Sequence, residues 1–336
     1  MQLSKEQLED AAKMASTPDL PNFSRAGTGK THTTLHAMKL SGLSRHLVIA
    51  PKIAVSWWVE QAKEFLGADA RAVTTAGSPL VGDVVVTTYG VARSIADRIY
   101  DEFDGGTLTL DESQYARTPE AKMTAAIFGQ RTDLVGGIAE RFDTVWQLSG
   151  TPMQNFANDY YTQAAVLHLE HFASLGITDY ESFCKRFTYS AKRQYNARMP
   201  PVWKIVGSTN EALLGRIVYE GIGAIRRLDA PGMPDLRYRE LSVPVRLSRE
   251  VRAAMAGKSE KEILTELNDP DSVMAKVWKL VGLAKVDEVV PYIGDCYKSS
   301  PILLGCWHHE VIEAYKSRLT AMGLRVEVVT GKTRDE

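Results

Sequence analysis

Ala26-Gly27-Thr28-Gly29-Lys30-Thr31 (AGTGKT) has the glycines and the Lys-Thr ending of a phosphate-binding loop. Its glycines allow backbone N–H groups to wrap around phosphates. Lys30 would reach the β- and γ-phosphates, and the Thr31 hydroxyl would hold Mg²⁺ at the start of a helix. The glycine usual six positions before the lysine is Ser24 here, so the pattern is imperfect. The residues expected to bind the nucleotide phosphates are Gly27, Thr28, Gly29, Lys30 and Thr31.

An acidic element follows an apolar run farther along the chain. Thr107-Leu-Thr-Leu leads directly into Asp111-Glu112, so a predicted strand ends in two carboxylates. Asp111 is placed to bind Mg²⁺ through water and Glu112 to polarise the attacking water, the two tasks that phosphoryl transfer leaves to acids. The sequence has no Asn-Lys-x-Asp guanine-reading motif, which disfavours GTP. We therefore expect ATP and Mg²⁺ as ligands, with Lys30, Asp111 and Glu112 as catalytic residues and Thr31 and Asp111 at the metal.

Apolar runs and amphipathic stretches alternate over the first 155 residues. Runs rich in Val, Ile, Leu and Thr are typical of strands buried on both faces of a parallel sheet. These runs are His46–Pro51, Asp83–Tyr89, Thr107–Asp111 and Thr144–Ser149. The alternation predicts an α/β domain whose active site lies beyond the carboxyl ends of the strands. Only Asn22–Ser24, which leads into the phosphate loop, is a weak strand candidate.

The pattern changes after about residue 155. Helical periodicity dominates to about residue 238 with few strand signals, and residues 183–228 carry nine Lys or Arg against two acids. That basic segment predicts either a positive surface or a solvated helical face. An extended run at 239–247 and helices to about residue 296 follow. Pro301–Cys306 and Arg325–Thr330 are then predicted strands on either side of a helix at 308–322.

Composition limits the function classes. The 336 residues carry 40 Lys+Arg and 41 Asp+Glu, for a formal net charge of −1, which excludes a globally basic coat but not a local basic groove. No apolar stretch approaches the roughly 20 residues of a membrane-spanning helix, and the N-terminus lacks the apolar core of a signal peptide. The three cysteines form no metal or disulfide pattern. We expect a cytoplasmic protein, or a nuclear one in a eukaryotic cell, with no membrane partner.

The order of these motifs resembles helicase superfamily two. More narrowly, it resembles the Swi/Snf-type DNA-dependent ATPases and their compact annealing-helicase branch. The segments similar to motifs I to III are Gly27–Thr31, Ala50–Lys52, Thr87–Tyr89, Asp111–Gln114 and Leu148–Pro152, with Gln154-Asn155 after them. Looser similarities are Arg226-Arg227 before Met233-Pro234, Trp57 or Trp58 before Glu64-Phe65, and segments 302–309 and 328–334, which resemble motif IV and the strand after it.

The resemblance implies a fold and a division of the chain. It implies a RecA-like P-loop NTPase lobe with a parallel sheet, a helical insertion, and the start of a second RecA-like lobe. We expect lobe 1 at 1–155, the insertion at 156–240, a linking strand and helices at 241–298, and the partial lobe 2 at 299–336. Motifs V and VI would lie beyond Glu336. Because an arginine finger from motif VI typically contributes about 10³–10⁵ in rate, the chain alone is expected to hydrolyse ATP weakly. A second polypeptide could supply the rest of lobe 2.

The resemblance also assigns roles to single residues. Gln7 would read the adenine. Gln114, which stands where the family usually has His, would couple the nucleotide to lobe movement together with Ser149, Gly150 and Thr151. By their positions in motifs Ia and Ib, Lys52, Thr88 and Tyr89 would contact the phosphates of double-stranded DNA without reading its sequence. Trp57 and Trp58 have the helical spacing of packing residues, which favours a core role over base stacking.

Three functions remain open from the sequence. The first is an ATP-dependent translocase on double-stranded DNA. The second is a strand-separating DNA or RNA helicase of the same superfamily. The third is a truncated nucleotide- and DNA-binding module with little or no turnover. ATP hydrolysis stimulated by duplex DNA would favour the first function, and stimulation by single strands or RNA would favour the second. ATP binding without hydrolysis would favour the third.

Overall fold

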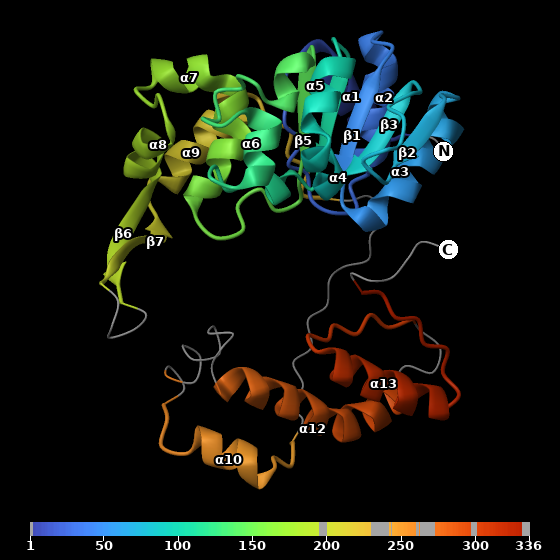
Figure 1. The fold of residues 1–336 in the computed structure, drawn as a ribbon, viewed down its shortest axis with the longest axis vertical. Coiled ribbons are helices and arrows are strands. Elements are labelled where there is room, and N and C mark those ends of the chain that lie inside the picture. The colour runs from blue at the N-terminus through green and yellow to red at the C-terminus, as the bar shows by residue number, and fades with distance from the viewer. Residues whose placement is uncertain are drawn as a thin grey trace. The chain divides into compact units, whose positions relative to one another are not determined.

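A computed structural model describes residues 3–194, 200–229, 242, 244–259, 262, 273–296 and 301–330. The chain divides into two compact units, Met1–Pro234 and Asp235–Glu336. Each unit is described by itself below (Figure 1).

A five-stranded parallel sheet forms the centre of the first unit, in the order β2-β3-β1-β4-β5. The strands are β1 (His46–Ala50), β2 (Ala70–Val73), β3 (Val84–Thr88), β4 (Thr107–Asp111) and β5 (Thr144–Leu148). The four apolar runs are thus confirmed as strands of one parallel sheet. The edge strand β2 was not predicted, because it is only four residues long and its two central residues are exposed.

The backbone leading into the phosphate loop extends this sheet beyond β5. Asn22 forms isolated parallel bridges with Leu148 and with Ile225. The N–H of Asn22 donates to Gln147 O at 2.8 Å, and the N–H of Phe23 donates to Ile225 O at 2.8 Å. The weak candidate at 22–24 is therefore sheet-like, although it forms single bridges rather than a full strand.

Helices cover both faces of the sheet because successive strand residues point to opposite sides. Val48, Val84 and Trp146 pack on one face with side chains of α1 (Lys5–Ser16), α2 (Lys30–Ser41) and α3 (Val55–Leu66). Leu47, Leu108 and Val145 pack on the other face with side chains of α4 (Tyr89–Ser94), α5 (Ala96–Glu102) and α6 (Lys122–Phe128). The result is the three-layer α/β lobe predicted from the sequence (Figure 1).

The insertion packs against the second of these faces. Its elements are α7 (Leu169–Ser174), α8 (Tyr180–Phe187), β6 (Thr188–Arg193), β7 (Val202–Ser208) and α9 (Glu211–Arg216), with single π-helical turns at 161–165 and 217–221. The largely helical prediction is corrected by the antiparallel hairpin β6–β7. Its signal was the β-branched and aromatic run Val202–Val206, which stood out poorly among helical neighbours. Tyr195 and Arg198 of the predicted basic segment lie outside the described residues.

The regular elements of the second unit, over the residues that the structure describes, are helices. The unit contains α10 (Arg249–Met255), α12 (Val273–Cys296) and α13 (His309–Ala321). Val286, Val290 and Ile293 of α12 pack against Val311 and Tyr315 of α13.

Two strand predictions in this unit are wrong, and one helix prediction is confirmed. α13 matches the helix predicted at 308–322, whereas 301–306 and 325–330 form no strand and no other regular secondary structure. Two isolated strands do not make an independently stable sheet, and Leu303 is 99% exposed. The run at 239–247 shows no strand at residues 242 and 244–247, and its other positions lie outside the described residues, as do Met233, Pro234 and 331–334. The search of the described part of the chain finds no helix able to cross a membrane.

Candidate functional site

The phosphate loop connects the sheet-like segment at 22–25 to the first turn of α2. Gly27 and Gly29 have φ of 84° and 82°, in the left-handed region that favours glycine. A Cβ on Gly29 would also collide with the amide of Gln7. The Thr28 hydroxyl donates to Arg25 O at 2.8 Å and fixes the bend of the loop. The sequence AGTGKT therefore adopts a backbone that both glycines are needed to form.

Lys30 lies inside this loop. Its ammonium donates to Ser24 O at 2.9 Å and to Arg25 O at 3.3 Å. Burial lowers the pKa of Lys30, and the nearby charges of Glu112 and Asp111 oppose that shift. A partly buried cation that is near two carboxylates and donates to carbonyl oxygens gains further stabilisation from a phosphate dianion.

Asp111 and Glu112 end β4 at the same edge of the sheet. The buried indole of Trp58 donates its N–H to Asp111 Oδ2 at 2.8 Å, and the Glu112 N–H donates to Asp111 Oδ1 at 3.1 Å. Burial is the main cause of the raised pKa of Asp111; the Trp58 hydrogen bond acts to lower it, and the Glu112 charge to raise it. The structure confirms that Trp58 packs in the core, whereas the core prediction is wrong for Trp57, which is 48% exposed. The structure adds a contact of Trp58 with Asp111 that the sequence did not indicate.

A chain of hydrogen bonds runs from Glu112 to the segment after β5. Gln114 donates from Nε2 to Glu112 Oε2 at 2.6 Å and accepts at Oε1 from the Ser149 hydroxyl, also at 2.6 Å. The Thr151 N–H in turn donates to Ser149 Oγ at 3.0 Å. Glu112 has φ of 51°, a left-handed conformation uncommon for a residue other than glycine. This conformation turns the carboxylate of Glu112 towards Gln114, so the two segments are joined without a histidine.

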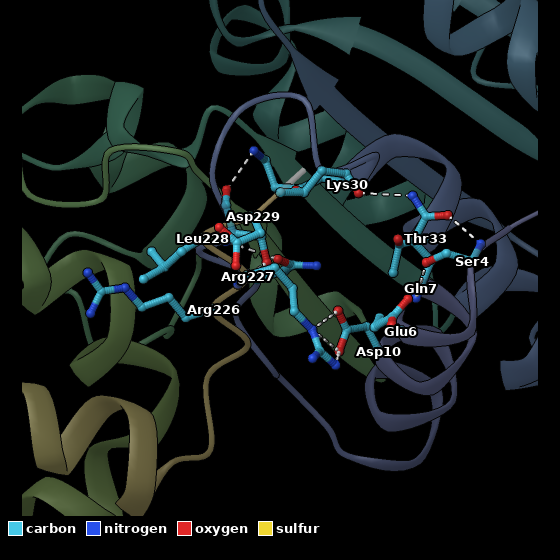
Figure 2. Close-up of a pocket in the computed structure, with 13 residues that line it drawn as sticks. Ser4, Glu6, Gln7, Asp10, Lys30, Thr33, Arg226, Arg227, Leu228 and Asp229 are labelled. Atoms are coloured by element: carbon cyan, nitrogen blue, oxygen red, sulfur yellow. Dashed lines mark hydrogen bonds and ion pairs between the residues drawn. The ribbon is translucent and has the colours of Figure 1, made fainter. Parts of the chain in front are cut away.

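A cavity of about 450 Å³ opens beside the phosphate loop (Figure 2). Gln7 lies in its wall, where Nε2 donates to Thr28 O at 2.9 Å and Oε1 accepts from the Ser4 N–H at 2.9 Å. Gln7 is also the third residue of α1, where it forms a capping box with the N-cap residue Ser4. The cavity is lined by Ser4, Glu6, Gln7, Asp10, Asn22, Ser24, Thr28, Lys30, Thr33, Arg226, Arg227, Leu228 and Asp229.

Arg227 and Asp10 form an ion pair across this cavity, and neither was assigned a site role from the sequence. The Arg227 guanidinium contacts both Asp10 oxygens, at 2.7 Å from Nη2 and 3.0 Å from Nε (Figure 2). The Arg227 N–H donates to Ser24 Oγ at 3.0 Å, and its carbonyl accepts from the Arg25 N–H at 2.9 Å. The adjacent arginines were the available signal, but their partner on α1 is 217 positions away.

The three residues expected to contact DNA have different surroundings. Thr88 is the last residue of β3 and pairs with Ala50, the last residue of the neighbouring strand β1, and Lys52 follows β1. Both Lys52 and Thr88 therefore lie at the carboxyl edge of the sheet. Tyr89 is 5% exposed, and its hydroxyl donates to Asp111 O at 2.9 Å. The expectation for Tyr89 is corrected, because a buried side chain that supports Asp111 cannot lie against a phosphate backbone.

The oxygen donors at the site fit a magnesium ion. Asp111 accepts a single hydrogen bond at each carboxylate oxygen, which leaves lone pairs on both, and Thr31 lies one residue after Lys30 in the first turn of α2. Hard oxygen donors of this kind, together with water and phosphate, are the ligands that Mg²⁺ prefers. No group of three or more His, Cys, Asp or Glu suited to a metal occurs among the described residues, so a site here would rely on few protein ligands.

Comparison with known proteins gives one sequence relative. No family model matches the chain. The DNA repair protein RAD5B of Arabidopsis thaliana is 26% identical over 163 residues, which are 44% of this chain and 12% of that protein.

Two solved structures are similar in fold. The Sulfolobus solfataricus SWI2/SNF2 ATPase core in complex with dsDNA matches with a TM-score of 0.52 and 19% identity, over 96% of this chain and 65% of that one. The SWI2/SNF2 ATPase core domain of the same organism gives a TM-score of 0.49 at 20% identity, over 88% of this chain and 57% of that one. This chain therefore spans less than two thirds of the length of each of these proteins. The chain is thus similar in sequence to RAD5B over part of its length, and it shares the fold of the SWI2/SNF2 ATPase core.

Proposed function

We propose that this chain binds ATP with Mg²⁺ and, within a two-lobed ATPase, couples ATP hydrolysis to movement along double-stranded DNA. The observation that carries the proposal is the hydrogen-bonded chain from Glu112 through Gln114 to Ser149 and Thr151. It links Glu112, the acid that would orient the attacking water, to the segment that follows β5.

The phosphate loop supplies the binding step. Backbone N–H groups at the start of α2 attract anionic oxygens, and Lys30 would exchange its two carbonyl partners for the β- and γ-phosphates. Thr31 and Asp111 would hold Mg²⁺, which neutralises charge on the phosphates during transfer. Gln7 and the cavity beside it would receive the adenine, because Gln7 already contacts the loop at Thr28.

The acids and their partners supply the chemical step. Glu112 would polarise the water, and its backbone conformation and the Gln114 amide fix the orientation of its carboxylate. Loss of the γ-phosphate changes the charge next to Glu112. That change reaches Ser149, Gly150 and Thr151 through Gln114, which is how hydrolysis would be coupled to movement of a second lobe.

DNA would lie along the carboxyl edge of the sheet. Lys52 and Thr88 stand there, and phosphate contacts from such residues give salt-sensitive binding without sequence preference. The relative RAD5B is a DNA repair protein, and the SWI2/SNF2 ATPase core of similar fold was solved in complex with dsDNA. We accordingly place this chain with DNA, in the cytoplasm or, in a eukaryotic cell, in the nucleus.

ATP binding and DNA-stimulated hydrolysis test the proposal together. Lys30→Ala removes the buried cation and should weaken ATP binding by about 30-fold or more. Lys39→Ala, an exposed lysine on the same helix, is the matched control and should leave the affinity unchanged. Unchanged ATP affinity in Lys30→Ala would refute the site.

The kind of nucleic acid that stimulates ATP hydrolysis distinguishes the three functions that the sequence left open. Hydrolysis stimulated more by blunt duplex than by single strands supports movement on double-stranded DNA. Stimulation by single strands or RNA with strand separation would instead indicate a helicase. Tight ATP binding with no hydrolysis at saturating DNA would indicate a binding module.

A further inference from the structure

The hairpin of the insertion projects from the body of the first unit as a two-stranded ribbon (Figure 1). β6 and β7 pair antiparallel, with Lys192 opposite Trp203, Arg193 opposite Val202, and Ala191 opposite Lys204. Each strand is hydrogen-bonded only to the other, since the described sheets contain no third strand beside them. The ribbon therefore presents two faces and two edges to its surroundings.

The ribbon carries one sign of charge. Residues 188–208 include Lys192, Arg193, Arg198 and Lys204 and no Asp or Glu, whereas the whole chain has a net charge of −1. Residues directly opposite one another share a face, so Lys192 lies on the face of Trp203, and Arg193 and Lys204 lie on the other. Positive charge is therefore available on both faces, which suits a polyanion that passes along the ribbon.

Trp203 is the second unusual feature. It is 67% exposed, whereas the other tryptophans of the first unit, Trp57, Trp58 and Trp146, are 48%, 0% and 0% exposed. The Lys192 ammonium lies over its ring, 5.5 Å from the centroid. Charged side chains on exposed edges protect a ribbon from aggregation, but a large exposed indole works against that protection. A binding role accounts for both the charge and the indole.

We propose that the β6–β7 ribbon is a second DNA contact, in which Trp203 stacks on an unpaired base and Lys192 contacts the adjoining phosphate. The inference rests on the proposed function and adds to the strand-end residues Lys52 and Thr88. Bases inside a duplex are stacked on both faces, so an exposed indole can stack only where bases are unpaired. The preferred substrate is therefore a duplex that carries a single-stranded extension.

Binding of the full chain to labelled DNA tests the ribbon. Two substrates are compared by fluorescence anisotropy: a blunt duplex, and the same duplex with a single-stranded tail of either polarity. The wild-type chain should bind the tailed duplex more tightly. Trp203→Leu keeps an apolar side chain but removes the stacking face, so it should weaken tailed-duplex binding by about 10-fold and leave blunt-duplex binding unchanged. Trp203→Phe retains an aromatic ring and should stay within about 3-fold of wild type.

Two further variants test the charge of the ribbon and the position of the tryptophan. Lys192→Gln should reduce the slope of log affinity against log salt by about 0.7 on the tailed duplex, as expected for one lost phosphate contact on a single strand. Trp278→Leu makes the same substitution at a 45% exposed tryptophan of α12 and should change neither substrate.

Two results would overturn the ribbon proposal by itself. One is tailed-duplex binding by Trp203→Leu equal to wild type, which would leave the ribbon as a contact for protein. The other is an equal loss in the Leu and Phe variants, which would indicate a structural role for Trp203. In both cases the wild-type chain would still bind ATP and blunt duplex DNA, so the proposed function would stand. Their absence from the wild-type chain would instead refute the proposed function and the inference with it.

Discussion

The indole N–H of Trp58 donates a 2.8 Å hydrogen bond to Oδ2 of Asp111, which joins the buried face of α3 to the acid at the end of β4. The bond stabilises the ionised form of a carboxyl group whose pKa is raised mainly by burial. Because Trp58 would act through Asp111, it is a positioning residue for the proposed Mg²⁺ ligand.

Trp58→Phe should weaken Mg²⁺ binding while leaving the core filled. The variant keeps an aromatic ring but loses the N–H, so Asp111 becomes less acidic and less well oriented. Loss of such an outer hydrogen bond typically costs about 10-fold or more in metal affinity. A Mg²⁺ titration of ATP binding should shift to higher metal concentration by about that factor. Trp57→Phe, at the exposed neighbour, is the control, and coincident Mg²⁺ titrations for Trp58→Phe and wild type would contradict the role.

Gln114 should matter for coupling more than for binding. Its amide contacts both Glu112 and Ser149, so Gln114→Leu breaks the link but leaves the phosphate loop intact. ATP affinity should stay within about 3-fold, whereas DNA-stimulated hydrolysis should fall by about 10-fold or more, the loss of about one charge-assisted hydrogen bond. Gln114→His, the family's usual residue, should restore the stimulation.

A double variant tests whether Gln114 and Ser149 act through the same hydrogen-bonded link. Ser149→Ala removes the other end of the same link, so the double variant Gln114→Leu/Ser149→Ala should be hardly worse than either single one. Losses that simply multiply would mean that the two residues act independently. ATP affinity, measured in parallel, keeps binding and coupling apart.

The pair Arg227–Asp10 should stabilise the first unit and its cavity. Asp10 is 9% exposed at its side chain and Arg227 is 40% exposed, so solvent screens the pair in part. Arg227→Ala leaves a buried carboxylate without its partner and should lower the free energy of unfolding by about 2 kcal/mol, less than for a fully buried pair. Arg227→Ala/Asp10→Asn should recover part of that loss in denaturant melts. No difference between the single and double variants would contradict the pairing.

The parts of the fold that depend on local pattern were predictable, and the parts that depend on long-range contacts were not. The runs at 46–51, 83–89, 107–111 and 144–149 became β1, β3, β4 and β5 because buried parallel strands need continuous apolar sequence. The runs at 301–306 and 325–330 have similar local character. They form no strand because a strand needs partners that the sequence of one run does not specify.

In the candidate site, too, the residues set by local pattern were predictable and those set by long-range contacts were not. The spacing of AGTGKT and of the residues after Thr107 identified Lys30, Asp111 and Glu112, which the structure brings to one edge of the sheet. The partners of these residues come from elsewhere in the chain: Trp58 for Asp111, and Arg227 for Asp10 and Ser24. Tyr89 was misjudged for the same reason, because only the folded chain shows that its side chain is buried and that its hydroxyl donates to Asp111 O.

His46 should make the first unit sensitive to mild acid. Burial lowers its pKa from 6.5 to about 4, although the Asp83 charge opposes the shift. Its Nδ1 lies 2.9 Å from the Thr107 hydroxyl between β1 and β4. Because the folded form holds the ring neutral, the unfolded chain binds the extra proton first. The contribution of His46 to stability is therefore complete above pH 6.5 and is lost as the pH falls towards about 4.

His46→Gln isolates this contribution, because glutamine keeps a polar side chain beside Thr107 but does not titrate. Wild type should lose about 3 kcal/mol more stability than the variant between neutral pH and pH about 4, since each pKa unit corresponds to about 1.4 kcal/mol. Urea melts of both proteins over this range measure the difference, and carboxylates common to both cancel in the comparison. Parallel stability curves would show that His46 is protonated as readily in the folded state as in the unfolded one.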